Sequence, residues 1–278
     1  MVLDKGALGD RILQATEMLS CCEFCERRCR VDRRQGQEGV CGVGVASHVY
    51  RHYISYAEEI ELLPSYMAYF SGCNFRCDSC IQAPQCLEAG GVPADAEFLR
   101  TMARNAAAQG AQTLNLVGGE PSLHVHTILE MAADAIPLPL VLNSNMYMTP
   151  MVLGWLDGII SLYLADFKFG NDNCASRIAG VGNYTAVVTR NLQQASSQGR
   201  LLVRHLLLPG HVECCLRPVA TWMARNLPDV PLRVMYSYTQ GWRSGESQLN
   251  RLVSGAEISA AGDIIKQSGV REYEPTAT

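Results

Sequence analysis

Residues 65–80 read SYMAYFSGCNFRCDSC, an apolar run that ends in a Ser-Gly turn and three cysteines. The run is typical of a buried strand, and the thiols follow it with the spacing C-x3-C-x2-C. Three thiolates in one short loop bind three irons of a [4Fe–4S] cube and leave the fourth iron open to an external ligand. The alternative is a zinc loop that takes its fourth ligand from elsewhere, for example Cys86. We therefore predict a metal centre at Cys73, Cys77 and Cys80.

Five further strand candidates follow at helix-length intervals, which is the pattern of parallel strands joined by helices. Six β/α units are fewer than a closed barrel of this type requires. The predicted fold is therefore α/β, a partial (β/α)6 barrel, with a doubly wound sheet as the alternative. The further strand candidates are residues 113–117, 138–143, 159–167, 200–208 and 232–238.

The chain divides by composition into two predicted regions. Residues 1–64 are rich in cysteine and charge and show little periodicity, so we expect a small cysteine-rich, metal-binding module there. Residues 65–278 then form the partial barrel with a C-terminal helix within 247–268. The other stretches with helical character are 94–109, 122–135, 183–197 and 217–227.

The composition excludes several classes of protein. A net charge of −4 gives no reason to expect nucleic acid or an acidic membrane as partner. No apolar run is long enough to cross a bilayer, and residues 1–19 are typical of an amphipathic helix rather than a signal peptide. We therefore expect a soluble, cytoplasmic protein. In a reducing compartment the 12 cysteines indicate metal binding rather than a disulfide framework.

Polar or glycine-rich motifs directly follow five of the predicted strands. Because the carboxyl ends of parallel strands meet at one face of such a barrel, we expect these motifs to build one site. The motifs are Ser71-Gly72-Cys73, Gly118-Gly119-Glu120-Pro121, Asn143-Ser144-Asn145, Asp166-Phe167-Lys168 and Pro209-Gly210-His211.

The cysteine spacing after the first strand and the GGEP sequence at 118–121 after the second resemble the radical SAM superfamily. This resemblance implies a [4Fe–4S] cluster at the three cysteines and bound S-adenosylmethionine (SAM). It also implies that Gly118, Gly119 and Glu120 contact the amino group of SAM, where glycines allow close approach and a carboxylate faces an ammonium. Alone, GGEP would also suit an ordinary strand-to-helix turn.

Three further stretches narrow the resemblance. DFK at 166–168 and VRHLLLPGH at 203–211 are similar to patterns of pyruvate formate-lyase activating enzymes. CEFCERRCRVDRRQGQEGVCG at 22–42 is similar to activating-enzyme-related proteins, a branch whose substrates are generally not established. The extra clusters of many glycyl-radical activases follow the radical SAM motif, whereas this cysteine group precedes it.

Strand alternation supports part of the expected SAM site. Asp166 and Lys168 share one face of their strand, and Asn143 and Asn145 share a face in the same way. The resemblance implies that all four contribute to the cofactor site. The alternative for each is a structural ion pair or a capping residue.

Arg204 and His205 cannot both point inward along an ideal strand. The resemblance favours Arg204, which together with Lys168 would hold the SAM carboxylate. A rim ion pair is again the alternative.

The second cysteine group has the spacing Cys22-x2-Cys25-x3-Cys29, followed by Cys41. Four thiolates in a segment with a small core suit a zinc ion or a second iron–sulfur cluster. The alternative is a set of free cysteines, and Cys21 is a possible substitute for Cys22.

The resemblance implies a radical SAM enzyme that takes one electron from a donor such as flavodoxin or ferredoxin. Its substrate is then either a partner enzyme, as for an activase, or a small molecule. In the second case an epimerase or dehydrogenase would use Cys214 or Cys215 as hydrogen-atom donor, although adjacent cysteines are often packing residues. The alternative from another class is a non-catalytic iron–sulfur or zinc protein.

Overall fold

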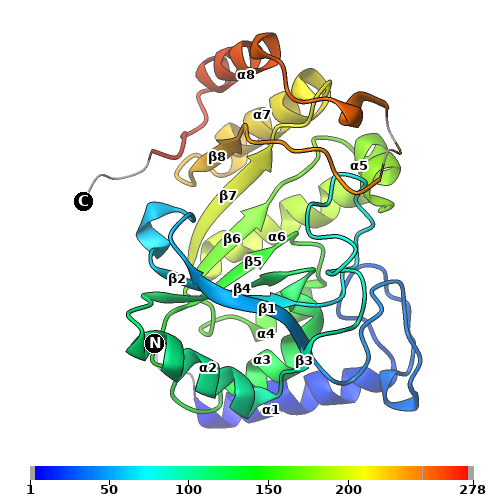
Figure 1. Cartoon of the computed structure of the whole chain (residues 1–278), viewed down its shortest axis with the longest axis vertical. Coiled ribbons are helices and arrows are strands. Elements are labelled where there is room, and N and C mark those ends of the chain that lie inside the picture. Colours follow the sequence, from blue (N-terminus) through cyan, green and yellow to red (C-terminus); the bar gives the residue numbers. More distant parts are fainter. Residues whose placement is uncertain (1–3, 244, 246, 275–278) are drawn as a thin grey trace.

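The computed structural model describes residues 4–243, 245 and 247–274, and its strands form one eight-stranded sheet (Figure 1). The strands are β1 (His48–Ser55), β2 (Ser65–Phe70), β3 (Val92–Pro93), β4 (Thr113–Gly118), β5 (Leu140–Ser144), β6 (Leu162–Asp166), β7 (Arg200–Leu206) and β8 (Leu232–Met235).

The helices are α1 (Lys5–Glu17), α2 (Ala96–Ala108), α3 (Val125–Met131), α4 (Pro150–Trp155), α5 (Asp172–Ala179), α6 (Tyr184–Gln198), α7 (Arg217–Asn226) and α8 (Gly255–Ser268). Side-chain caps fix several of their starts. The Asp95 carboxylate accepts from the backbone N–H of Phe98 at 2.8 Å, and Ser254 and Glu257 form a reciprocal capping box at α8. No helix among the described residues is long and apolar enough to span a membrane.

The six predicted strands are all present and all parallel. They lie in the order β2-β4-β5-β6-β7-β8, and the antiparallel strands β1 and β3 extend the sheet beyond β2. The parallel strands follow the chain without reversing direction along the sheet, which excludes the doubly wound alternative. The partial (β/α)6 barrel is thus confirmed, with two added edge strands.

Side chains alternate strictly between the two faces of the parallel strands. One face packs into the main core through residues such as Leu142, Tyr163 and Val203. The other face carries a small apolar cluster and then, further along the same strands, polar groups. That cluster consists of Leu62, Val141, Leu162, Leu164 and Leu202, and the polar residues beyond it are Asn143, Asp166 and Arg204.

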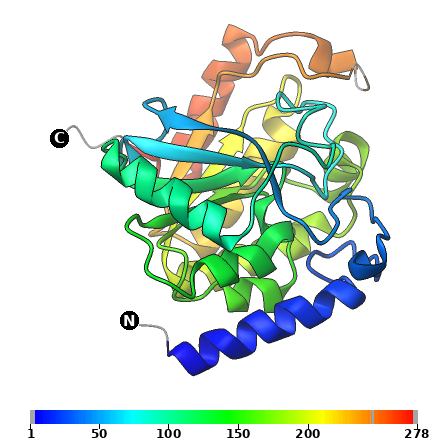
Figure 2. The same ribbon diagram turned by 60° about the horizontal axis from the view of Figure 1, so that its bottom comes forward.

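The segment before residue 65 is joined to the barrel. Residues 48–55, placed by composition in the N-terminal module, form β1 and pair with β2. The side chain of Arg11 on α1 donates to the carbonyls of Trp155 and Asp157 at 2.9 and 2.6 Å. Figure 2 shows α1 on the outside of the helical layer and the dark-blue segment after it returning to the barrel. The division at residue 64 stays a prediction.

Candidate functional site

A cavity of about 370 Å³ lies at the carboxyl ends of the parallel strands, and Cys73, Cys77 and Cys80 are part of its wall. Four of the five strand-end motifs predicted to converge do meet there, whereas Pro209-Gly210-His211 is not part of the cavity wall. The predicted SAM-site residues in the cavity wall are Gly118, Gly119, Asn143, Asn145, Asp166, Lys168 and Arg204.

The cysteine loop is held against neighbouring elements by its backbone. The N–H groups of Arg76 and Asp78 donate to the carbonyls of Ala179 and Ile178 at the end of α5, at 3.0 and 2.9 Å. The Arg76 guanidinium also donates to the Cys73 carbonyl at 2.7 Å. These bonds fix the loop while its thiols face the cavity.

Burial sets the protonation of the loop thiols. Desolvation raises the pKa of Cys73 well above its usual value and that of Cys77 to about 12. A hydrogen bond from Cys86, whose sulfur is 3.6 Å away, lowers the pKa of Cys80 to about 6. Metal ligation deprotonates a thiol outright. A bound cluster would therefore stabilise the thiolate forms that burial disfavours.

The thiols of the cavity wall do not all converge on one point. The sulfurs of Cys80 and Cys86 are 3.6 Å apart, but no three of the four sulfurs of Cys73, Cys77, Cys80 and Cys86 lie within 4.8 Å of one another. Thiolates on separate irons of a cube are spread apart, whereas the four ligands of one zinc ion are closer together. The three loop thiols therefore suit a [4Fe–4S] cluster, with zinc bound by Cys80 and Cys86 as the alternative.

The two glycines of the GGEP motif are required by contacts within the protein. A Cβ atom on Gly119 would overlap the carbonyl oxygen of Gly72 in the turn before the cysteines. Gly118 has φ = +119°, and a Cβ there would collide with the backbone of Phe70. The motif thus brings the ends of β2 and β4 into direct backbone contact and holds the cysteine loop in place.

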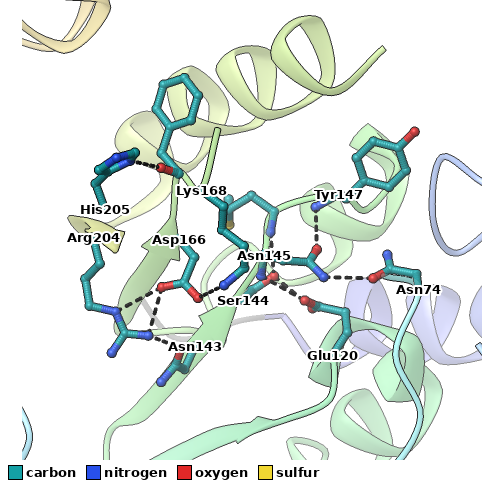
Figure 3. Close-up of polar contacts among 12 residues, drawn as sticks. Asn74, Glu120, Asn143, Ser144, Asn145, Tyr147, Asp166, Lys168, Arg204 and His205 are labelled. Atoms are coloured by element: carbon teal, nitrogen blue, oxygen red, sulfur yellow. Dashed lines mark hydrogen bonds and ion pairs between the residues drawn. The ribbon is translucent and has the colours of Figure 1, made fainter. Parts of the chain in front are cut away.

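An ion-pair network forms part of the cavity wall, and its residues are drawn in Figure 3. The Asp166 carboxylate accepts from Lys168 Nζ at 2.6 Å and from Arg204 at 2.9 Å, and Arg204 also donates to Asn143 Oδ1 at 2.6 Å. Although desolvation opposes it, the attraction of Arg204 and Lys168 lowers the pKa of Asp166 to about 2. The side chain of Lys168 is 31% exposed and that of Arg204 12%, so Lys168 is the more accessible cation.

Sheet register decides the orientation of Arg204 and its neighbour. Arg204 points into the cavity from the same face as Leu202, as the resemblance implied. His205 points to the other face, where Nδ1 lies 2.7 Å from the Phe167 carbonyl (Figure 3). Burial lowers the pKa of His205 to about 4, so this imidazole is neutral at pH 7.

Glu120 lies behind the cavity wall, although the resemblance implied that it touches SAM. Its carboxylate is fully buried and accepts from the Ser122 N–H, the Ser144 hydroxyl and the Asn145 N–H at 2.8–3.1 Å. Desolvation raises its pKa, while these donors favour the ionised form. Glu120 therefore positions Asn145, which does line the cavity.

The N-terminal cysteines lie next to the barrel mouth. The backbone of residues 24–26 pairs with residues 147–149 through a β-bridge between Cys25 and Met148. Cys25 and Cys41 pack in one buried cluster with Val43 and Leu123. Desolvation raises the pKa of Cys22, and the nearby Cys29 and Cys41 thiols raise it further. No three of these four sulfurs are within 4.8 Å of one another.

Cys214 and Cys215 do not line the cavity. They lie in a single π-helical turn, Val212–Leu216, behind the end of β7. The Cys214 sulfur is 3.8 Å from that of Cys174 and 4.0 Å from that of Cys215. This placement does not support a hydrogen-donor role at the cavity.

Sequence reasoning missed Glu58 in the cavity wall. It follows β1, an antiparallel strand between β3 and β2 that the pattern of parallel units did not predict. Its carboxylate is 4.0 Å from Arg204, and desolvation raises its pKa. No motif surrounds this residue, and only the pairing of β1 with β2 brings it to the site.

Comparison with known proteins agrees with this geometry. Residues 65–139 match the model of a 4Fe-4S single cluster domain. An uncharacterized protein of Methanocaldococcus jannaschii, MJ0674, is 29% identical over 255 residues, covering 88% of this chain and 74% of that protein.

Solved structures share the fold at low sequence identity. SuiB of Streptococcus suis bound to precursor peptide SuiA aligns over 70% of this chain and 43% of its own, with a TM-score of 0.52 and 11% identity. SuiB bound to S-adenosylmethionine aligns over 72% and 47%, with a TM-score of 0.49 and 12% identity. This chain therefore spans less than half of SuiB. Residues 65–139 are thus similar to a 4Fe-4S cluster domain, and the likeness to SuiB bound to its precursor peptide shows a shared fold.

Proposed function

We propose that the protein binds SAM at a [4Fe–4S] cluster held by Cys73, Cys77 and Cys80, cleaves it reductively, and removes a hydrogen atom from a substrate. One observation supports this proposal above all. The three thiols face the same cavity as the glycines of the GGEP motif and the cations Lys168 and Arg204. Lys168 and Arg204 would attract the carboxylate of SAM, and the thiols would hold the cluster that its amine and carboxylate chelate.

Reduced by one electron, the cluster would supply cleavage of SAM to methionine and a 5′-deoxyadenosyl radical, which becomes 5′-deoxyadenosine on taking hydrogen from the substrate. The residues of this chain bind and orient. Lys168, the more accessible cation, would receive the SAM carboxylate, while Arg204 is held by Asp166 and Asn143 and keeps that corner rigid. Asn145, whose backbone is held by Glu120 and whose side chain bonds Asn74 and Tyr147, would form a fixed part of the wall against the same ligand.

The size of the cavity supports a proposal about the substrate class. About 370 Å³ is at the lower end of the range for ligand pockets, so SAM would occupy most of it. The group that loses hydrogen would then enter from the mouth. This favours an activating-enzyme-like reaction on a partner protein over a reaction on a small molecule enclosed beside SAM. Flavodoxin or ferredoxin would be the electron donor.

We also propose that Cys22, Cys25, Cys29 and Cys41 hold a second iron–sulfur cluster. Four thiolates form the ligand set of such a cluster, and all four belong to one short segment. Asn74, between Cys73 and Cys77, lies beside Cys25 and interacts with its thiol. Electrons from a donor would therefore reach the cavity over a short path.

The test of the main proposal is anaerobic reconstitution followed by measurement of 5′-deoxyadenosine with a chemical reductant. Cys77→Ala should abolish product formation, because a cube without one of its three thiolates is labile. The matched control is Cys21→Ala, at an exposed thiol, which should retain wild-type activity. Undiminished 5′-deoxyadenosine from Cys77→Ala would overturn the proposal.

A further inference from the structure

A third group of potential metal ligands lies outside the cavity and outside both cysteine loops. Cys174 belongs to α5, His211 follows β7, and Cys214 lies in the π-helical turn Val212–Leu216. One ligand atom from each lies within 4.8 Å of the others. Within the described residues, this is the only set of three or more Cys, His, Asp or Glu side chains that converges so closely.

The distance between the two thiols matches a single metal ion. The sulfurs of Cys174 and Cys214 are 3.8 Å apart. Two thiolates bound tetrahedrally to one zinc ion at about 2.3 Å each are about 3.8 Å apart. In the cavity loop the sulfurs of Cys80 and Cys86 are similarly close at 3.6 Å, but no third ligand atom of the described residues joins them within 4.8 Å.

The histidine is oriented by its second ring nitrogen. Nδ1 of His211 lies 2.9 Å from the Pro209 carbonyl, which can only accept a hydrogen bond. When Nδ1 donates this hydrogen bond, Nε2 is the ring nitrogen that would bind a metal. Histidine ligands of metals typically donate their other N–H to a backbone carbonyl in this way.

The surrounding backbone brings the three ligands together without a metal. Asn171 caps α5 by accepting from the Cys174 N–H at 2.8 Å, and its side-chain amide donates to the Cys214 carbonyl at 2.7 Å. The same amide lies 3.3 Å from the Cys174 sulfur. A Cβ atom on Gly170 would overlap the Cys215 carbonyl, so the two segments pack backbone to backbone. Single π-helical turns are rare and are frequently found at functional sites.

We propose that Cys174, His211 and Cys214 bind a zinc ion that links α5 to the turn after β7, with water as its fourth ligand. Sulfur and imidazole ligands in a tetrahedral arrangement favour zinc. Cys174 and His211 are buried, while Cys214 is exposed, which leaves a path for the ion and for water. None of the three residues lines the SAM cavity, so the site is distinct from the proposed reaction centre.

We expect the zinc content of the protein to depend on these three residues and not on the iron–sulfur clusters. Anaerobically purified protein, reconstituted with iron and sulfide, should contain one more zinc per chain than Cys214→Ala or His211→Ala. Cys215→Ala is the matched control, because it removes the adjacent thiol and leaves the three ligands in place. Because Cys214 is exposed, we expect its variant to fold normally.

Two further measurements decide the outcome. Cobalt(II) added to the zinc-depleted protein should give tetrahedral d–d bands and sulfur-to-metal charge transfer, and these should be absent in Cys214→Ala. Bound zinc should also slow alkylation of Cys214 by iodoacetamide, followed by peptide mass spectrometry. Equal zinc content in the wild type, Cys214→Ala and His211→Ala, or alkylation unaffected by zinc, would overturn the proposal. Both measurements are independent of SAM cleavage, so a failure here leaves the proposed function standing.

Discussion

The two cysteine loops of this protein lie side by side but are built differently. The cavity loop begins directly after β2, and its position follows from the sheet and from the close contact of Gly119 with Gly72. The N-terminal loop has no strand of its own. It is held by backbone pairing of residues 24–26 with 147–149, by packing of Cys41 against Leu123, and by hydrogen bonds from Arg27 and Arg33 to backbone carbonyls of the barrel.

This difference indicates which loop depends on its metal. The cavity loop has a rigid frame that exists before any cluster binds, so its thiols are preorganised for chemistry. The N-terminal loop contributes few buried apolar residues, and Arg28 and Arg30 adopt positive φ angles of 41° and 55°. Bound metal would compensate for this strain and for the ordering of the loop. We therefore expect the cavity cluster to carry the reaction and the N-terminal site to stabilise the fold.

Replacing Cys25 by Ala should give the largest difference between the effects on the two loops. Removing a structural ligand should cost several kcal/mol of stability, because metal binding and folding are coupled. The expected result is loss of roughly half the iron and a clearly lower Tm, with 5′-deoxyadenosine formation retained when a chemical reductant is supplied. Iron analysis and thermal denaturation check this, with Cys21→Ala as control. Unchanged iron and Tm would show that the N-terminal thiols are free.

Asp166→Asn should affect the cavity side alone. Removing one partner of a buried ion pair typically costs about 3–5 kcal/mol, here by leaving Lys168 and Arg204 without their shared carboxylate. The N-terminal iron should be retained, because the hydrogen bonds and ion pairs of Asp166 are with cavity residues. Urea unfolding and iron analysis measure the two effects. Asp10→Asn, at an exposed position, is the matched control.

The same substitution carries a pH signature. The pKa of Asp166 is lowered from 3.8 to about 2, so its ionised form stabilises the folded state above about pH 4. That contribution is lost as the pH falls through 4 towards 2. For the metal-free proteins, the stability difference between wild type and Asp166→Asn should therefore be full at pH 7 and shrink below pH 4. A difference independent of pH would contradict the ion-pair assignment.

Glu120→Gln should give a smaller effect that tests the connection between the loops. Glu120 holds Asn145, and Asn145 donates to Asn74 Oδ1 at 2.8 Å in the cavity loop. Replacing one acceptor oxygen by an amide should cost about 1–3 kcal/mol and weaken SAM binding in parallel. Unfolding and SAM titration would be compared with Glu17→Gln at an exposed position. Weaker SAM binding without any loss of stability would instead support the direct contact between Glu120 and SAM that the resemblance implied.

Much of the barrel could be predicted from sequence because its signals are local. Buried parallel strands read as short apolar runs, and all six were located within a few residues of their observed limits. β1 was missed because HVYRHYIS is interrupted by charged and polar residues that face away from the core at the sheet edge. The short helices α4 and α5 were missed because six to eight residues give little periodicity.

By itself, the sequence determined the thiol spacing of the cavity loop, the order of the strands and the motifs at their ends, since each depends on residues close together in the chain. The tertiary structure decided which motif residues reach the ligand. Strand register turned Arg204 inward and His205 outward, and burial placed Glu120 behind the cavity wall. It also brought Cys174 to Cys214 across 40 residues, because the parallel neighbours β6 and β7 end side by side and their following segments pack together. Such convergence depends on sheet topology. The residues involved are far apart in the chain, so no sequence motif with a fixed spacing reveals them.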